Sequence, residues 1–199
     1  TFHHMRQQMQ KRDGESNLSL ADFIAPQDGP EDWMGAFCVT TGHGVDERAK
    51  AFEDNHDDYN AILLKALADR LAEALAEQLH MQVRTRYWGY APSECLSHVE
   101  LIKERYVGVR PAPGYPACPD HTEKETLFRL LEVEKHCGVA LTDSFAMFPT
   151  ASVSGLYFSH PESRYFSVGK IGQDQLTDLA NRKNMPVEQL ARWLAPNLD

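Results

Sequence analysis

The chain has 199 residues, of which 42% are hydrophobic and 25% charged, the composition of a globular domain with one sizeable core. Its net charge of −9 and pI near 5.4 argue against nucleic-acid binding, which needs clustered Lys and Arg. No apolar run approaches the roughly 20 residues that cross a bilayer, and the N-terminus lacks the pattern of a signal peptide. We therefore expect a cytoplasmic protein without a nucleic-acid or membrane partner.

The residues that commonly bind metals are scattered along the chain. Cys38, Cys95, Cys118 and Cys137 form no CxxC pair, which predicts free thiols rather than a zinc site or a disulfide framework. No histidine pair has i, i+4 spacing with a third ligand nearby, so we predict no metal site. The first residues, 1–13, are basic, Gln-rich and begin without Met, which suggests a helical start and a fragment of a longer chain.

The first half of the chain is predicted to be mainly helical. Met34 to Thr40 has the composition of a strand. From Asp46, a candidate N-cap, to about Arg84 the sequence is rich in Ala, Leu, Glu and Lys, which predicts one long helix. Within it a leucine recurs every four residues, which predicts a stripe facing the core; the stripe is Leu63, Leu67, Leu71, Leu75 and Leu79.

The second half contains the strand signals and two terminal helices. Ser97 to Glu100 fits a capping box that starts a short helix, and the proline-rich segment 107–120 predicts a loop. A further helix is expected from Thr122 to Gly138. The remaining elements are strands at 141–148, 151–160 and 164–171, the last two forming a hairpin, and helices at about 174–183 and 186–194. This order predicts a single α+β domain over residues 1–199, with a twisted antiparallel sheet flanked by helices.

One loop carries the most specific motif in the chain. Residues 110–119 read RPAPGYPACP and are followed by DHTEK. Other stretches with a characteristic order and spacing are HDDYN at 56–60, YWGY at 87–90, SFAM at 144–147, SVSG at 152–155 and WLAPNL at 193–198. Together these motifs resemble the reactivation domain of cobalamin-dependent methionine synthases, over nearly the whole chain. The resemblance implies the activation-domain fold, with its N-terminal part missing.

The resemblance also implies a site for S-adenosylmethionine. It places Arg110 as the anchor of the ligand, with Ala112, Gly114 and Tyr115 in the same loop. An arginine suits the carboxylate of the methionine moiety because its planar guanidinium forms bidentate pairs. Prolines stiffen the loop, and we expect them to leave carbonyls free for the adenine amino group. The family's ligand also contacts positions that match Tyr165 and Phe166.

The resemblance also implies roles for three carboxylates. Acidic residues matching Glu73 and Glu104 lie near the ligand in the family, and one matching Asp69 meets a histidine released from cobalt in the partner domain. On the residues alone, acidic side chains four apart are usually a solvated helix face. Likewise prolines often only shape a surface loop, and strand aromatics are usually core.

The implied function is the reductive reactivation of methionine synthase, a methyltransferase. The domain would present S-adenosylmethionine to cob(I)alamin, with flavodoxin or a related flavoprotein as the reductant. Positioning suffices for this transfer, so no catalytic residue is expected and the isolated chain should be inactive. Cobalamin and zinc would be held by other domains of the parent enzyme, and the cobalamin-binding domain of the same polypeptide would be the partner.

Two alternatives come from other classes of protein. The chain would be a docking module for the cobalamin domain or flavodoxin if it does not bind S-adenosylmethionine in this truncated form. A hydrolase that uses Asp69, Glu73 and Glu104 would need a carboxylate with a strongly raised pKa in a pocket, and nothing in the sequence brings these groups together.

Overall fold

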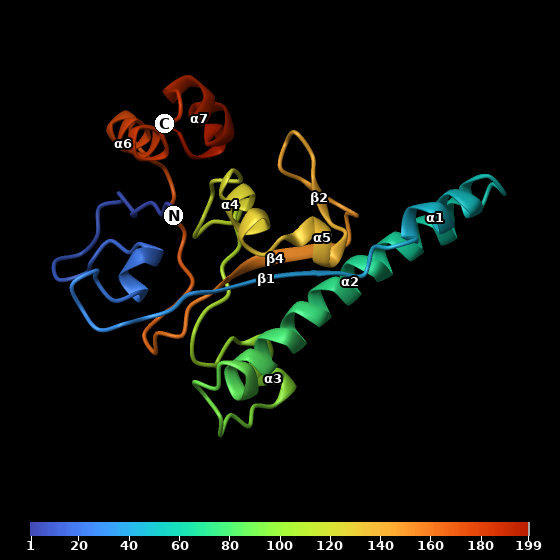
Figure 1. Ribbon diagram of the computed structural model, residues 1–199, viewed down its shortest axis with the longest axis horizontal. Helices are drawn as coiled ribbons and strands as arrows, with labels where there is room; N and C mark the ends of the chain where they lie inside the picture. Colours follow the sequence, from blue (N-terminus) through green and yellow to red (C-terminus); the bar gives the residue numbers. More distant parts are fainter. Residues whose placement is uncertain (199) are drawn as a thin grey trace. The chain divides into compact units, whose positions relative to one another are not determined.

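The computed structural model describes residues 1–198, which form helices and short strands (Figure 1). The chain divides into two compact units: one comprises residues 1–35, 96–126 and 156–199, and the other residues 36–95 and 127–155. They are called here the loop unit and the helix unit. The α+β class is confirmed, whereas the single domain expected over residues 1–199 stays a prediction.

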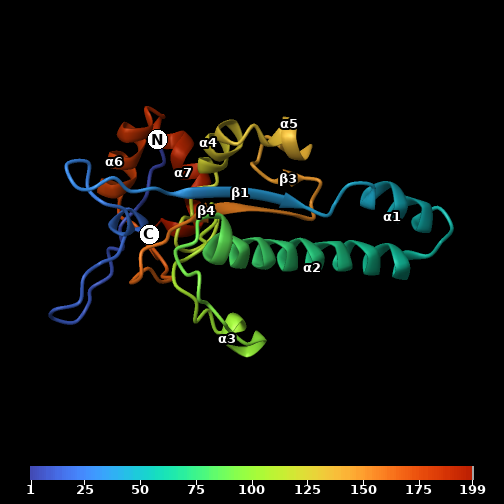
Figure 2. The ribbon, with the colours of Figure 1, turned by 60° about the horizontal axis from the view of Figure 1, so that its bottom comes forward.

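The helix unit is built around two strands that are far apart in the sequence. β1 (Gly35–Thr40) pairs with β4 (Ser152–Tyr157). Thr41, just after β1, donates its backbone N–H to Ala151 O, just before β4, at 3.0 Å, so the strands run antiparallel. Both ribbon views show α2 (Asp58–Gln82) beside this pair (Figure 2).

The long helix predicted from Asp46 to Arg84 is two helices. α1 (Val45–Glu53) begins after Gly44, which has φ +76°, and α2 begins after Asp57, whose side chain accepts from Asn60 N at 3.1 Å. Between them residues 54–56 form a turn, in which His56 has φ +59°. The predicted start was one residue off and Asp46 lies in the first turn of α1 rather than at its N-cap, but the continuity of the helix was wrong, because a local cap at Asp57 restarts it. After α2 the chain widens into a π-helical turn, η2 (Val83–Tyr87).

The face of α2 that enters the core was also predicted wrongly. The buried positions are small residues, Ala61, Ala68, Ala72 and Ala76, followed by His80. Four of the five leucines of the stripe are exposed, and Leu79 is half-buried; the exposed four are Leu63, Leu67, Leu71 and Leu75. Alanines let the helix approach the strands closely, and Thr41 Oγ1 donates to Ala68 O at 2.7 Å.

The elements between residues 122 and 148 differ in length from those predicted. The single helix expected up to Gly138 is interrupted at Glu132, with φ +47°, into α4 (Glu123–Leu130) and α5 (Val133–Cys137). Gly138, with φ +63°, ends α5 as expected. The strand expected at 141–148 is a short antiparallel hairpin of β2 (Ala140–Leu141) and β3 (Met147–Phe148).

The loop unit contains the remaining helices. α3 (His98–Ile102) begins at the predicted capping box, in which Ser97 N donates to Glu100 Oε2 at 2.9 Å, and it stops before Glu104, which has φ +52°. The terminal helices α6 (Gln173–Lys183) and α7 (Val187–Trp193) are confirmed. Single 3₁₀ turns are η1 (Leu20–Phe23) and η3 (Ala195–Asn197). Residues 1–13, expected to be helical, form no helix.

The core of the loop unit lies between α6, α7 and the segments they cover. Its buried residues are Met5, Val168, Ile171, Leu176, Leu179, Ala180, Leu190 and Leu194. The segment 164–171 was expected to be the second strand of a hairpin, but it forms no strand and contributes Val168 and Ile171 to this core instead. Its Gly169 has φ +75°, which a regular strand does not allow.

Candidate functional site

The proline-rich loop is held at both ends by backbone hydrogen bonds. Val109 exchanges two of them with Phe158, at 2.9 and 3.0 Å. Leu156 N donates to Pro111 O and Val168 N donates to Pro116 O, each at 2.8 Å. Since proline cannot donate, the loop is fixed through its carbonyls by segments that follow it in the chain.

A tight turn forms the tip of the loop. Tyr115 N donates to Ala112 O at 3.1 Å, and Gly114 N donates to Cys118 O at 2.7 Å. Gly114 has φ +96°, and a Cβ at this position would lie 2.6 Å from His121 Nδ1. The turn therefore requires glycine for its backbone conformation and for the space that the imidazole occupies.

The carbonyls of the loop are less available than the sequence suggested. Those of Pro111, Ala112, Pro116 and Cys118 accept backbone N–H groups, and that of Arg110 accepts the Tyr165 hydroxyl. The expectation that the prolines leave these carbonyls outside any hydrogen-bonding pattern was wrong for these five. An adenine amino group would need the second lone pair of such an oxygen or another carbonyl.

The structure brings Arg110 and Tyr165 together. The Tyr165 hydroxyl donates to Arg110 O at 2.5 Å, while its side chain remains 41% exposed. Arg110 is half-buried, and Tyr115 at the tip of the loop is exposed. Phe166 packs partly against the core of α6 and α7. Tyr165 can thus offer a ring face beside the loop, whereas Phe166 also has a structural role.

A buried ionic cluster fixes the end of the loop, and no sequence pattern indicates it. Lys183 Nζ, at the end of α6, donates to Asp120 Oδ2 at 2.5 Å, to Thr122 Oγ1 at 2.6 Å and to Glu123 Oε1 at 2.5 Å. The side chains of Lys183, Asp120 and Glu123 are 8%, 1% and 2% exposed. Burial lowers the pKa of Lys183, but the neighbouring Asp120 and Glu123 raise that pKa on balance. Lys183 lies 60 residues from Glu123 in the sequence, so only the fold could reveal that the two are partners.

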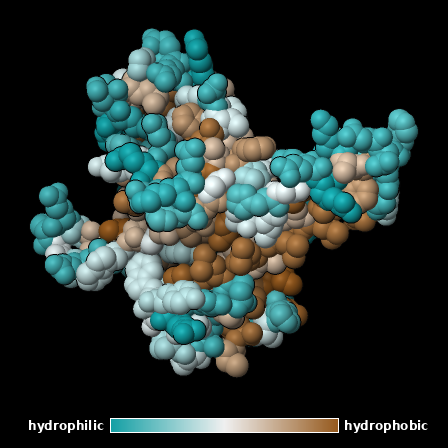
Figure 3. Space-filling view, turned by 45° about the vertical axis from the view of Figure 1, so that its right-hand side comes forward, coloured by the Kyte–Doolittle hydropathy of each residue, from teal (hydrophilic) through white to brown (hydrophobic). Residues whose placement is uncertain are grey.

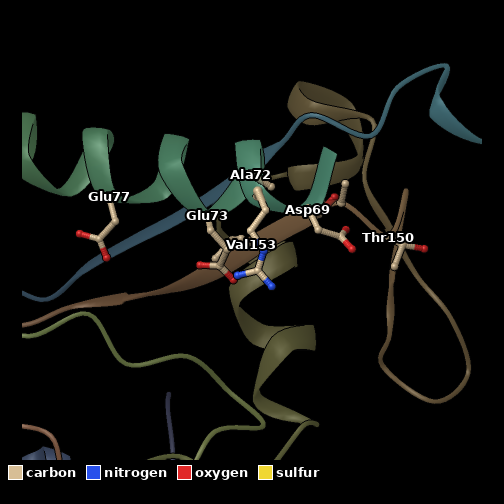
Figure 4. A pocket seen from close by; sticks show the side chains of 9 residues that line it. Asp69, Ala72, Glu73, Glu77, Thr150 and Val153 are labelled. Carbon is tan, nitrogen blue, oxygen red and sulfur yellow. The ribbon is translucent and has the colours of Figure 1, made fainter. Parts of the chain in front are cut away.

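A second candidate site is a pocket of about 470 Å³ within the helix unit. Its walls come from one side of α2 and from the residues that lead into β4; they are Asp69, Arg70, Ala72, Glu73, Glu77, Thr150, Ala151, Ser152 and Val153. Figure 4 shows the carboxylates of Asp69, Glu73 and Glu77 on the same side of the helix. The predicted pair Asp69 and Glu73 is therefore brought into one pocket, with Arg70 also in its wall.

Glu104, the third predicted carboxylate, does not line this pocket. It is exposed in the turn after α3 and belongs to the loop unit, together with Arg110 and Tyr165. The nine predicted residues thus fall into two groups. Seven belong to the loop unit and the other two, Asp69 and Glu73, to the helix unit.

Residues 1–198 contain no group of three or more His, Cys, Asp or Glu side chains arranged to hold a metal ion. In the same part of the chain, no helix has both the length and the apolar character needed to cross a bilayer.

By fold, the chain is an α+β domain of helices and small antiparallel sheets. The family model described as the activation domain of vitamin B12-dependent methionine synthase matches residues 1–184. The chain belongs to this family.

A solved relative agrees with this assignment. A structure described as the crystal structure of the MetH reactivation domain bound to AdoHcy is 62% identical to this chain, with a TM-score of 0.95. The match covers 98% of this chain and 60% of that chain. The chain therefore spans less than two thirds of the length of this relative.

Proposed function

We propose that this chain binds S-adenosylmethionine and presents its methyl group to cob(I)alamin during reductive reactivation of methionine synthase. The observation that carries the proposal is the 62% identical reactivation domain bound to AdoHcy. AdoHcy is what S-adenosylmethionine becomes when its methyl group leaves. A domain that holds the product of this transfer has a site shaped for the donor as well.

The loop unit supplies the main contacts in this proposal. Arg110 pairs with the ligand carboxylate through its guanidinium, and the Tyr165 hydroxyl on Arg110 O holds the start of the loop in place. The ring faces of Tyr165 and Tyr115 attract the positive sulfonium. Gly114 and Ala112 keep the turn narrow enough for close approach of the ligand, and Phe166 closes the aromatic wall.

The carboxylates complement the positive charges of the ligand. By the family resemblance, Glu73 and Glu104 are assigned to the ligand, whose ammonium and sulfonium groups a negative charge stabilises. Asp69, in the wall of the pocket beside Glu73, is assigned to the histidine that the cobalamin domain releases from cobalt. Both Asp69 and Glu73 are exposed, so a partner can reach them.

The methyl transfer needs little acid or base catalysis from these residues. In the transfer the methyl–sulfur bond breaks with its electron pair left on sulfur, and a cobalt–carbon bond forms from the electron pair of cob(I)alamin. One electron from flavodoxin or a related flavoprotein first reduces cob(II)alamin. The chain contributes orientation, since holding two reactants in line replaces a bimolecular encounter.

The partners follow from this role. The cobalamin-binding domain of the same polypeptide receives the methyl group, and the flavoprotein docks to deliver the electron. The cobalamin and zinc of the parent enzyme belong to its other domains. The chain is therefore proposed to be part of a cytoplasmic methyltransferase and to have no turnover alone.

Titration of S-adenosylmethionine by calorimetry tests the proposal. Arg110→Ala should weaken binding by roughly ten- to hundredfold, because a charged hydrogen bond contributes about 1.5–3 kcal/mol. Arg192→Ala, which removes an exposed arginine of α7, is the matched control and should leave the affinity unchanged. Equal affinities for all three proteins would remove Arg110 from the site.

A docking module is the second candidate function, because the chain spans only 60% of the solved relative. Residues of the unmatched part would then be needed to complete the ligand site. This candidate predicts no heat from S-adenosylmethionine at millimolar concentration, but retained binding to the isolated cobalamin domain in a pull-down.

A further inference from the structure

The leucine stripe of α2 is a surface that the chain leaves uncovered. Leu63, Leu67, Leu71 and Leu75 are 40%, 52%, 60% and 41% exposed. Figure 3 shows apolar side chains gathered in one continuous area along this helix. Scattered exposed leucines are ordinary, but a contiguous apolar area on one element marks a packing surface.

The opposite side of α2 is already packed, so a rotation of the helix does not explain the exposed leucines. Ala68, Ala72 and Ala76 face the strands and are 4%, 1% and 0% exposed. Turning the helix to bury the leucines would expose this close-packed alanine face. The helix therefore has two apolar faces, one of small residues that is covered and one of large residues that is not.

The spacing of the stripe favours a globular partner over a second copy of the helix. A coiled-coil seam needs apolar residues that alternate three and four apart, whereas these leucines lie strictly four apart. Such an i, i+4 ridge winds around the helix and fits the grooves of an element that crosses at about 50°, the common packing of globular domains.

The charges beside the stripe argue against a lipid surface. Helices that lie on membranes carry Lys and Arg on their polar face. Here the ridge beside the leucines contains Asp69, Glu73 and Glu77, which line the pocket of the helix unit. Anionic headgroups would be repelled by these three carboxylates.

The solved relative indicates the occupant. It matches 98% of this chain with a TM-score of 0.95, yet this chain accounts for only 60% of its length. We propose that the leucine stripe of α2 is the packing surface for the part of the activation domain that the relative contains beyond this match. This inference rests on the family and not on the proposed ligand, so either can fail alone.

Thiol labelling of Leu71→Cys in two proteins tests the inference. One protein is this chain, and the other, called the whole domain, is this chain together with the part of the relative that lies beyond the match. Exposed Cys95 is the internal reference. Lys65→Cys, an exposed site of α2 outside the stripe, is the control.

In the present chain the thiol at position 71 should react about as fast as Cys95. In the whole domain it should react at least tenfold more slowly, while the thiol at position 65 keeps its rate. A position 71 that stays equally reactive in the whole domain would overturn the inference. Equal slowing at positions 65 and 71 would overturn it as well. So would a reaction at position 71 that becomes slower in this chain as its concentration rises, because that result would identify a second copy as the occupant.

Discussion

Gly114 holds a left-handed backbone conformation against the ring of His121. Lys124 Nζ lies 3.0 Å from Nδ1 of the same ring. Burial, and then the charge of Lys124, lower the pKa of His121, while burial lowers the pKa of Lys124. The tip of the loop is thus packed against the imidazole of His121, whose uncharged form these two effects favour.

Gly114→Ala should destabilise the chain more than the same change at another positive-φ glycine. Gly14, with φ +88° and nothing within 4 Å of an added Cβ, is the matched control. Backbone strain alone predicts a loss of about 1–2 kcal/mol at Gly14, and the clash with His121 adds about 1–3 kcal/mol at Gly114. Urea unfolding measures both losses. If His121→Ala does not restore part of the stability of Gly114→Ala, the ring is not the obstacle.

Other residue-level predictions succeeded or failed according to whether their partners are local. The Ser97 capping box could be predicted because both of its members lie within four residues. The Tyr165 hydroxyl bonds to Arg110 O across 55 residues, and no sequence pattern indicates this contact. The family motif placed both residues in one site without explaining why.

At the level of elements, the Lys183 cluster joins the end of α6 to the first turn of α4 and to the segment after the loop. Its three charged side chains are almost fully buried. Removing one member of such a group leaves the other charges without compensation in a poorly solvated place. The cluster therefore fixes the relation between these elements within the loop unit.

Lys183→Met should lower the free energy of unfolding by about 3–5 kcal/mol, because Asp120 and Glu123 would remain buried without the ammonium group and would keep only their contacts with Thr122 and His3. Lys135→Met removes an exposed lysine whose Nζ lies 2.8 Å from Glu132 Oε2, and it should cost about 0–1 kcal/mol. Urea unfolding compares the two variants. Similar small losses would mean that water reaches the cluster.

Helix boundaries show the same division between local and distant causes. The break between α1 and α2 ends at Asp57, a local cap whose side chain accepts from Asn60 N three residues further on. The segment 164–171 alternates like a strand, yet Val168 N pairs with Pro116 O of the loop. A tertiary contact there replaced the expected hairpin.

At the level of the molecule, the loop unit includes the N-terminal segment in its fold. Met5 is part of the core of α6 and α7, and His4 packs edge-on against Phe158 with ring centroids 6.0 Å apart. Burial lowers the pKa of His4 to about 4, although Glu123 partly opposes this effect. The segment 1–13 is thus ordered by packing rather than by helix formation.

The low pKa of His4 predicts a loss of stability in acid. In the unfolded chain the imidazole takes up a proton near pH 6.5, so its stabilising effect is complete above that pH and is lost as the pH falls towards 4. The shift corresponds to roughly 3 kcal/mol. His4→Gln should reduce the pH dependence of unfolding between pH 6.5 and 4, whereas His98→Gln, at an exposed position of α3, should not. Identical pH profiles for the two variants would contradict this account.

The sequence by itself determined the α+β class, the proline-rich loop, the Ser97 cap, the two terminal helices and the family. Each of these depends on hydrogen bonds between near neighbours, on the restricted backbone of particular residues, or on motifs that follow one another in a characteristic order. Only the tertiary structure decided which face of α2 is buried, which residues hold the loop and where residues 164–171 belong. The face of a helix that is buried depends on which element packs against it, and in α2 the alanines rather than the leucines pack against the strands. Hydrogen-bond partners more than fifty residues apart are likewise chosen by the fold, because no local spacing encodes them.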